Sequence, residues 1–289
     1  MSPIHQLWVS ARPHQWYKNG VLLIGIVFSA NLFNYSMWDN VVVAVVIFSA
    51  LSSAEYLIND VIDRERDRAH PTKRNRPIAS GRFAVSHALA IAAALTLGSL
   101  VVAWFVLGLY FLFSCVAYVA LTLFYSLYAK HALILDIVVI STGFVVRAIA
   151  GCFAIGVFPS SWLIVCAFLL ALLLAVEKRG QELTRLADGA GDHRPVLEQL
   201  SARILETFGN ISAASLLVSY LLYTGFTSRE YMWTTIPLVI LGLFRYLYLV
   251  RDRDTGAEPH IALRDGGLKV TLGLWVVMAV VIAHLSPPV

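Results

Sequence analysis

The sequence predicts an all-α protein that crosses a membrane several times, and two observations support that prediction. Hydrophobic residues make up 58% of the 289 residues and charged residues only 14%, whereas a soluble domain carries about 25% charged residues. The hydrophobic residues also fall in long blocks, which are typical of membrane helices. We therefore expect one transmembrane domain over residues 1–289.

The hydrophobic blocks predict nine membrane spans. A span needs about 20 apolar residues, and the turns after the third and the fifth block are very short. The expected spans cover approximately residues 19–36, 40–58, 86–106, 109–128, 133–156, 161–177, 207–226, 231–249 and 268–286.

Lysine and arginine are distributed unequally between the two ends of these spans. One side receives Arg12, Lys18, the basic loop at 64–82, Lys130 and the segments at 178–203 and 251–269, whereas the connections on the other side carry only Arg229. Basic loops stay in the cytoplasm. The sequence thus predicts an inner (plasma) membrane protein with a cytoplasmic N-terminus, an outer C-terminus and cytoplasmic charged loops.

The three cysteines do not indicate a disulfide framework or a metal cluster. Cys115, Cys152 and Cys166 all lie inside apolar blocks, where a cysteine usually serves as a small buried side chain.

An acidic pattern closes the second expected span. On an α-helix each residue advances by about 100°, so Asp60, Asp63 and Asp67 lie within about 100° of Asn59, on one face about 12 Å long. Glu55, one turn earlier, extends this face into the membrane. A solvated helix end is the alternative interpretation, but a carboxylate inside a span is costly and indicates function.

Three carboxylates and an amide on one face require a cation between them. Hard oxygen ligands of this kind suit Mg²⁺, which bridges protein carboxylates to substrate phosphates. We therefore predict that Asp60, Asp63 and Asp67 bind Mg²⁺ and act as the catalytic residues, with Asn59 beside them.

The next stretch, HPTKRNRPIASG, supplies Lys73, Arg74 and Arg76 between two prolines that prevent a continued helix. Three cations beside an acidic metal site suit a polyphosphate, because the metal binds some oxygens and arginine forks bind others. The same loop also serves as a positive-inside anchor.

These stretches resemble a known family. The pattern N-D-x-x-D-x-x-x-D at the end of the second span resembles the first signature of the intramembrane UbiA prenyltransferase superfamily. The wider set resembles its polyprenyl-phosphate phosphoribosyltransferase branch, and it comprises RPHQWYKN at 12–19, DRAHPTKRNRPIASG at 67–81, YSLYAKH at 125–131, GFVVRAIAG at 143–151 and EKRGQEL at 177–183. The resemblance implies a helical bundle around a cavity that opens to the cytoplasm.

The chain departs from the superfamily at its second acidic site. Aromatic prenyltransferases usually carry a second D-x-x-x-D after span six, whereas this chain has Lys178 and Glu182 at that spacing, with Arg179 between them. A lysine there would bind a phosphate directly. This suits the reaction of the branch, in which a lipid monophosphate attacks phosphoribosyl pyrophosphate (PRPP), so that two anionic substrates meet.

The resemblance implies roles for the basic residues. Lys73, Arg74 and Arg76 would hold the PRPP phosphates, and Lys18 would hold the phosphate of the polyprenyl lipid. The candidates for binding the second anionic substrate are Lys130, Lys178 and Arg179. The product would be a precursor of lipid-linked arabinose, destined for cell-wall arabinan, lipopolysaccharide or a secreted nodulation signal.

Four further polar residues are less decisive. Tyr125 and Tyr128 are typical of an aromatic belt, although Tyr125 is also a substrate-binding candidate. Asp136 and Arg147 lie about 16 Å apart along one span, too far to bridge. Each should face the interior, where Arg147 either lines the cavity or pairs with an acid on another helix.

Two other functions remain open at this point. An ordinary prenyltransferase of the superfamily would attach a polyprenyl chain to an aromatic acceptor, and the missing second D-x-x-x-D argues against it. A transporter would fit the number of spans, but the charges gather at one face rather than at mid-membrane.

Overall fold

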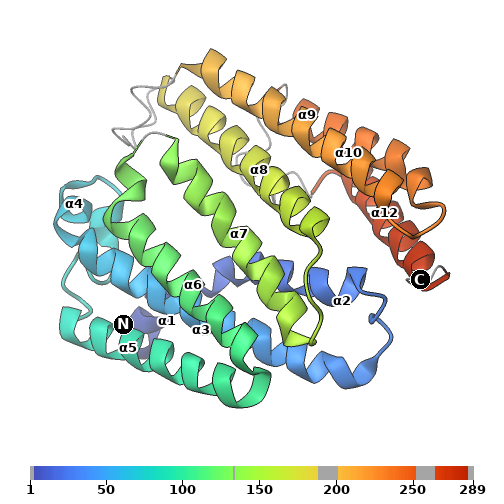
Figure 1. Cartoon of the computed structure of the whole chain (residues 1–289). Helices are drawn as coiled ribbons and strands as arrows, with labels where there is room; N and C mark the ends of the chain where they lie inside the picture. The colour runs from blue at the N-terminus through green and yellow to red at the C-terminus, as the bar shows by residue number, and fades with distance from the viewer. Residues whose placement is uncertain (1–2, 133, 188–200, 252–263, 286–289) are drawn as a thin grey trace. The chain divides into compact units, whose positions relative to one another are not determined.

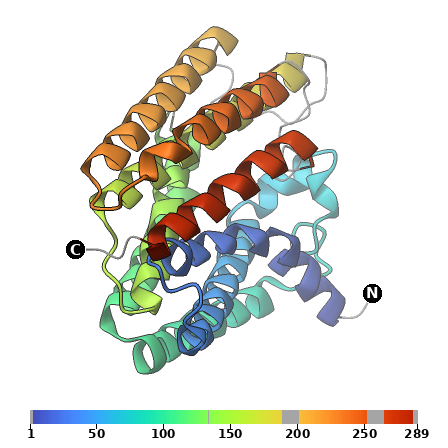
Figure 2. The same cartoon turned by 90° about the vertical axis from the view of Figure 1, so that its right-hand side faces the viewer.

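The computed structural model describes residues 3–132, 134–187, 201–251 and 264–285. All the regular secondary structure in this part of the chain is helical (Figures 1 and 2). Eight helices there are long and apolar enough to cross a membrane. The long helices are α3 (Trp38–Ile62), α5 (Val85–Val102), α6 (Leu109–Leu127), α7 (Leu135–Ala154), α8 (Ser161–Ala187), α9 (Ala202–Phe226), α10 (Ile236–Arg251) and α12 (Gly266–Leu285).

Shorter helical segments connect or extend the long helices. These are α1 (Pro3–Ala11), α2 (Ile24–Phe28), α4 (Arg64–Ala69), the π-helical end of α5 (η4, Ala103–Leu107) and the 3₁₀ segments η1 (Pro13–Leu23), η2 (Tyr35–Met37), η3 (Lys73–Asn75), η5 (Ala129–His131) and η7 (Met232–Thr235).

The expected span at 19–36 differs from the structure, where η1 and the short α2 replace a long helix. A 3₁₀-helix has three residues per turn, so Trp16, Asn19 and Leu22 line up on one face. Trp16 Nε1 donates to Ser53 Oγ (3.0 Å) and Asn19 Nδ2 donates to Ser49 Oγ (3.1 Å). These polar contacts hold the segment against α3 as a 3₁₀-helix. The other eight expected spans match the eight long helices.

The chain forms two compact units. The first comprises residues 1–26, 34–130 and 146–158, and the second comprises residues 27–33, 131–145 and 159–289. Helix α7 contributes its last residues to the first unit and its first residues to the second.

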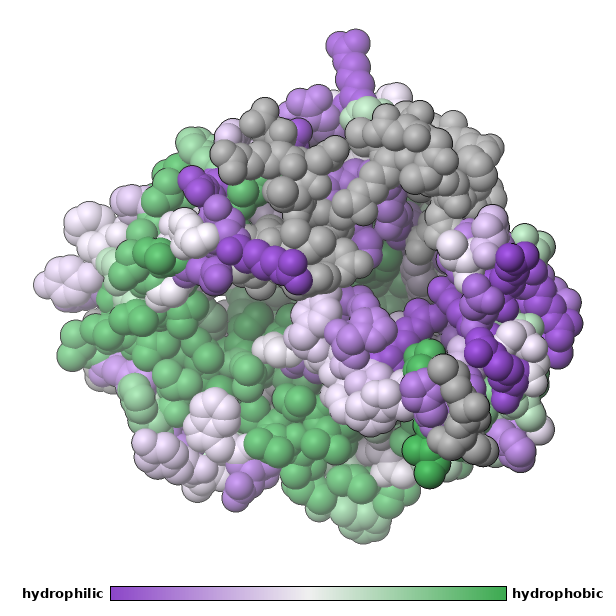
Figure 3. Space-filling model, turned by 180° about the vertical axis from the view of Figure 1, so that it is seen from behind, coloured by the Kyte–Doolittle hydropathy of each residue, from purple (hydrophilic) through white to green (hydrophobic). Residues whose placement is uncertain are grey.

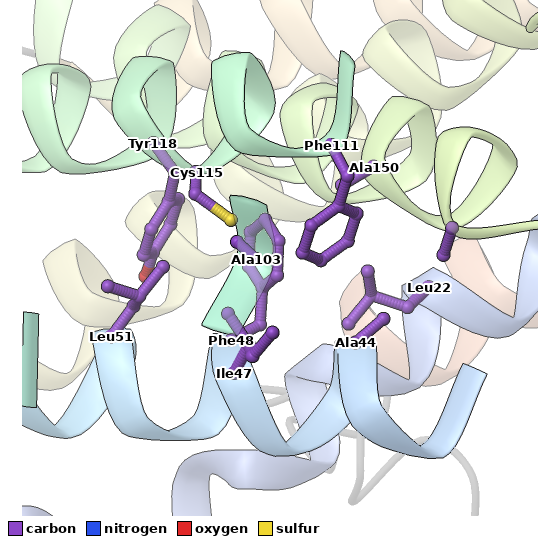
Figure 4. Packing of buried hydrophobic residues seen from close by; sticks show 11 residues of the cluster. Leu22, Ala44, Ile47, Phe48, Leu51, Ala103, Phe111, Cys115, Tyr118 and Ala150 are labelled. Atoms are coloured by element: carbon purple, nitrogen blue, oxygen red, sulfur yellow. The ribbon is translucent and has the colours of Figure 1, made fainter. Parts of the chain in front are cut away.

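The core of the first unit forms where α3 and α6 pack together (Figure 4). The ring of Phe48 meets those of Phe111 and Tyr118, with centroids 5.9 and 5.2 Å apart. Leu22 from η1 completes the same cluster and is fully buried. This cluster fixes the position of α3, whose C-terminal end carries the acidic pattern.

Two glycines allow the N-terminal segment to approach α7. A Cβ atom on Gly25 would lie 2.6 Å from the carbonyl carbon of Gly151, and a Cβ on Gly151 would collide with the backbone of Leu22. Since real Cβ atoms do not approach so closely, glycine is required at this crossing within the first unit.

In the second unit, α8 packs along α9, and α10 packs along α12 (Figures 1 and 2). An ion pair of 2.5 Å between Glu177 and Arg251 joins α8 to the end of α10. Gly209 on α9 leaves room for that pair, because a Cβ there would collide with the Glu177 carboxylate and the Arg251 guanidinium.

The surface is rich in hydrophobic side chains, which cover much of the face in Figure 3. Phe105, Phe113, Val218 and Phe244 are all more than half exposed. Such exposure would be unfavourable in water over large areas, but it is expected of helices that face lipid. The chain is therefore a multi-pass membrane protein.

Candidate active site

The predicted acidic face is present in the first unit, with one change in its helix. Helix α3 ends at Ile62, Asp63 has a φ of −87° and a ψ of 3°, and α4 begins at Arg64. Two backbone bonds continue the helical pattern through this break, since the Asp63 amide donates to the Asn59 carbonyl (2.9 Å) and the Asp67 amide to the Asp63 carbonyl (2.8 Å). The acids consequently remain on successive turns.

Two arginines from distant segments bind Asp60 and Asp67. Arg12 Nη2 lies 2.5 Å from Asp60 Oδ1, and Arg76 Nη1 lies 3.2 Å from the same oxygen. Arg76 Nη1 also lies 2.8 Å from Asp67 Oδ2. Both carboxylates are almost fully buried, with 2% and 4% exposure, so their charges require these partners.

Lys130 binds the other two members of the pattern. Its Nζ donates to Asp63 Oδ1 at 2.7 Å and to Asn59 Oδ1 at 3.4 Å. The acidic face is thus divided into two neighbouring pairs, Asp60 with Asp67 and Asn59 with Asp63, each bridged by its own cation. The sequence predicted all of these residues except Arg12.

The donor set suits a hard divalent cation by chemistry, because it consists of carboxylate and amide oxygens. In the arrangement described, however, those oxygens bind arginine and lysine. Among the described residues no three Asp, Glu, His or Cys side chains come close enough together to hold a metal ion. A metal on this face would therefore compete with these basic side chains for the carboxylates.

Arg12 is the site residue that sequence analysis missed. It adopts a left-handed conformation (φ 51°, ψ 58°) between α1 and η1, and its guanidinium lies 4.9 Å from the centre of the Tyr56 ring. Its signal was the RPHQWYKN stretch, in which Arg12, Trp16 and Asn19 all contact α3.

A second polar network lies deeper in the first unit, below the acidic face. Tyr118 donates to Glu55 Oε2 (2.8 Å), and Arg147 Nη2 donates to the Tyr118 hydroxyl (2.8 Å). Arg147 Nε also donates to Asn19 Oδ1 (3.1 Å). Arg147 is thus buried, as predicted, and it reaches the acid Glu55 on α3 through Tyr118.

The other predicted residues of this unit have various degrees of exposure. Arg74 is exposed, whereas Lys18, Lys73 and Tyr125 are half-buried. The loop that carries the basic residues is fixed by its own contacts, since Arg68 Nε donates to the Ala79 carbonyl (2.9 Å) and Arg82 donates to the Asn75 carbonyl.

The residues of the predicted second site lie on α8, in the second unit. Arg179 is buried and donates to Asp136 Oδ2 (3.0 Å) and to Glu182 Oε2 (2.5 Å). Asp136 therefore faces inward, as predicted, and its partner is Arg179 rather than Arg147. Lys178 is half-buried.

Comparison with known proteins places this geometry in context. Residues 20–264 match the model of the UbiA prenyltransferase family. A protein named decaprenyl-phosphate phosphoribosyltransferase from Corynebacterium glutamicum is 34% identical, over 96% of this chain and 86% of that protein. The nodulation protein NoeC of Azorhizobium caulinodans is 33% identical, over 95% of this chain and 81% of that protein.

The fold has a close counterpart among solved structures. A UbiA homologue from Archaeoglobus fulgidus, solved with GPP and Mg²⁺ bound, superposes with a TM-score of 0.73 at 17% identity, over 96% of this chain and 99% of that one.

Proposed function

Because the chain belongs to the UbiA prenyltransferase family, we propose that it is a polyprenyl-phosphate phosphoribosyltransferase. It transfers 5-phosphoribose from PRPP to a polyprenyl monophosphate of the decaprenyl type and releases pyrophosphate. The observation that carries this proposal is the balance of charge on the first unit's acidic face. Three carboxylates there are met by Arg12, Arg76 and Lys130, so groups that bind phosphate oxygens lie beside groups that suit a divalent cation.

The relatives named decaprenyl-phosphate phosphoribosyltransferase support the same reaction, because the similarity extends over nearly the whole chain. The residues on α8 agree with it. Lys178 stands where aromatic prenyltransferases usually carry an acid, and a fixed positive charge suits a second anionic substrate.

The proposed reaction needs no general base. A phosphate oxygen of the lipid, already anionic at neutral pH, forms the new bond to C1 of PRPP. The bond between C1 and the pyrophosphate oxygen breaks, and pyrophosphate leaves with the bonding electrons. The enzyme must therefore position two anions and stabilise the charge that develops on the leaving group.

The site residues have separate roles in this proposal. Asn59, Asp60, Asp63 and Asp67 face the pyrophosphate of PRPP, and Lys73, Arg74 and Arg76 hold its phosphates. Lys18 holds the phosphate of the lipid, which is the second anionic substrate, and Lys130 and Lys178 attract it. Arg179 and Glu182 support Lys178 on α8, and Tyr125 lies near the substrates. Arg147 acts on the acidic face through Tyr118 and Glu55.

We include Mg²⁺ as the cofactor of the proposed reaction. Asp60, Asp63 and Asp67 would hold it, and it would neutralise the charge of the departing pyrophosphate. The charged loops lie on the cytoplasmic side of the inner membrane in this proposal, where PRPP would be available. The product serves as a precursor of lipid-linked arabinose.

Transfer of a prenyl chain to an aromatic acceptor is the second candidate, and the fold shared with the GPP-bound homologue favours it. The two candidates differ in the substrate that loses pyrophosphate. For the phosphoribosyl reaction that substrate is PRPP, and for prenyl transfer it is the lipid.

The test uses membranes that contain the protein, supplied with PRPP labelled in its ribose, a polyprenyl monophosphate and Mg²⁺. We expect label to enter the organic phase with the wild-type protein, and to be lost with Asp63→Ala or with a chelator. Glu65→Gln on α4 is the matched control, since Glu65 is 76% exposed. Absence of labelled lipid across several chain lengths, with activity towards a prenyl diphosphate and an aromatic acceptor, would favour the second candidate.

A further inference from the structure

The position of Arg12 supports a role that the proposed function does not yet include. Asp60 Oδ1 binds two guanidinium groups at once, Arg12 at 2.5 Å and Arg76 at 3.2 Å. Arg76 also binds Asp67 and is therefore shared between two acids. Among the carboxylates that the structure describes, Arg12 binds Asp60 alone, so Arg12 can leave without freeing the second acid.

The backbone around Arg12 is fixed while its side chain is long and part-exposed. The Ser53 hydroxyl contacts both sides of Arg12, since it lies 3.1 Å from the Ala11 carbonyl and accepts from Trp16 Nε1 at 3.0 Å. The side chain of Arg12 is 22% exposed, whereas that of Asp60 is 2% exposed. Arg12 can thus change partner by side-chain rotation, with η1 remaining in place.

The Tyr56 ring provides a resting contact that does not depend on Asp60. The Arg12 guanidinium lies 4.9 Å from the ring centre, within the range of a cation–π interaction. Tyr56 lies one helical turn before Asp60 on α3. The guanidinium would therefore stay beside the acidic face after it leaves the carboxylate.

A divalent cation would compete with the two guanidinium groups for the Asp60 carboxylate, because like charges repel at such distances. The acidic face has oxygen donors of the kind that a hard cation prefers, but in the part of the chain that the structure describes no group of acids is arranged to hold a metal.

We propose that Arg12 is an additional substrate-binding residue that exchanges partners: it neutralises Asp60 until a divalent cation takes that carboxylate, and it then binds a substrate phosphate. This inference rests on the proposed function only for the identity of the phosphate. Because a guanidinium fork binds phosphate oxygens in pairs, Arg12 both opposes metal binding and favours binding of the polyanion.

Replacement of Arg12 should therefore change the affinity for the metal and the affinity for the polyanion in opposite directions, and the test measures both affinities. Mn²⁺ binding to the purified protein in detergent is measured without substrates, from the electron paramagnetic resonance signal of free Mn²⁺. Binding of inorganic pyrophosphate is measured separately, at saturating Mg²⁺. The variants are Arg12→Gln, Arg12→Lys, which keeps the charge but lacks the fork, and Arg203→Gln, a control at an exposed arginine on α9.

We expect Arg12→Gln to tighten Mn²⁺ binding and to weaken pyrophosphate binding, each by about tenfold, which corresponds to a typical charge-assisted contact. Arg12→Lys should fall between Arg12→Gln and the wild type, and Arg203→Gln should equal the wild type. Unchanged Mn²⁺ affinity in Arg12→Gln, or a change of both affinities in the same direction, would overturn the proposal. A loss of folding in Arg12→Gln leaves Arg12→Lys as the deciding variant.

These measurements separate this inference from the proposed function. Mn²⁺ binding involves no substrate, so a protein that makes no labelled lipid can still show the opposition between Arg12 and the metal. Conversely, a phosphoribosyltransferase whose Arg12→Gln variant binds Mn²⁺ as the wild type does would retain the proposed function and lose this role for Arg12.

Discussion

The ends of α3 and α8 both carry charged clusters, but the clusters are built in opposite ways. At the junction of α3 and α4 these two helices supply the acids, and the cations Arg12, Arg76 and Lys130 come from separate segments. At the end of α8 the helix supplies the cation Arg179, which binds Asp136 on α7 and Glu182 on its own helix.

The two clusters differ in how easily their charged side chains can change partners. The cations around α3 lie on flexible side chains that are 10–28% exposed, so solutes can compete with them. Arg179 and Asp136 are only 6% and 3% exposed. We infer that the α3 cluster exchanges partners during the reaction, whereas the Arg179 pair holds α7 and α8 together.

The largest expected effect is the contrast between two variants, each of which replaces one acid in one of the clusters. Asp63→Asn keeps the shape of the side chain but removes its charge, and we expect a loss of about 100-fold or more in turnover with little change in stability. Asp136→Asn should instead cost about 3 kcal/mol of unfolding free energy, because it leaves Arg179 without its buried partner.

Both quantities are measured on the same preparations, as turnover in nanodiscs and as SDS-induced unfolding in mixed micelles. The comparison between the clusters fails if Asp136→Asn abolishes turnover while its stability is unchanged.

The deep network in the first unit gives the next largest effect. Arg147→Gln should cost about 3 kcal/mol, because the network of Glu55 and Tyr118 within a span then loses its guanidinium. The double variant Glu55→Gln with Arg147→Gln removes both charges and should recover at least half of that loss. The unfolding free energies of the two single variants and the double variant, combined in a mutant cycle, provide the check. Additive losses would show that the Tyr118 bridge does not couple the two residues.

The glycine crossing in the first unit gives a smaller effect. Gly151→Ala should cost about 2 kcal/mol, because its Cβ would overlap the Leu22 backbone. Gly98→Ala on α5 is the control, since no atom lies within 4 Å of its added Cβ, and it should be neutral or slightly stabilising. Equal melting temperatures for the two variants would argue against the close approach of η1 to α7.

The smallest expected effect distinguishes the two basic neighbours on α8. Lys178→Gln should raise the KM for polyprenyl phosphate about tenfold, the effect of about 1.4 kcal/mol of lost binding, and leave stability unchanged. Arg179→Gln should mainly lower stability, because it breaks the pair with Asp136. A KM effect confined to Arg179→Gln would reverse these assignments.

The sequence was sufficient for the features that depend on local periodicity. Helical spacing placed Asn59, Asp60, Asp63 and Asp67 together, and apolar length located the eight long helices. Composition alone could not reveal that residues 13–23 form a 3₁₀-helix, because the deciding feature is the three-residue spacing of Trp16, Asn19 and Leu22.

Partners that lie far apart in the chain were harder to predict. Arg12 and Asp60 are separated by 48 residues, and Arg179 and Asp136 by 43. Helical periodicity gives the direction of a side chain around its own helix, but the packing of one helix on another decides which charge it meets. For this reason the sequence indicated that Asp136 and Arg147 face inward but did not identify their partners.

The most direct test of the proposed reaction uses PRPP labelled at two positions in parallel assays with polyprenyl monophosphate. Label in the 5-phosphate should enter the organic phase, while label in the β-phosphate should appear in water as pyrophosphate, in equal amounts and only with the active wild-type protein. Failure of the 5-phosphate label to reach the lipid, together with release of pyrophosphate from a prenyl diphosphate, would contradict the account.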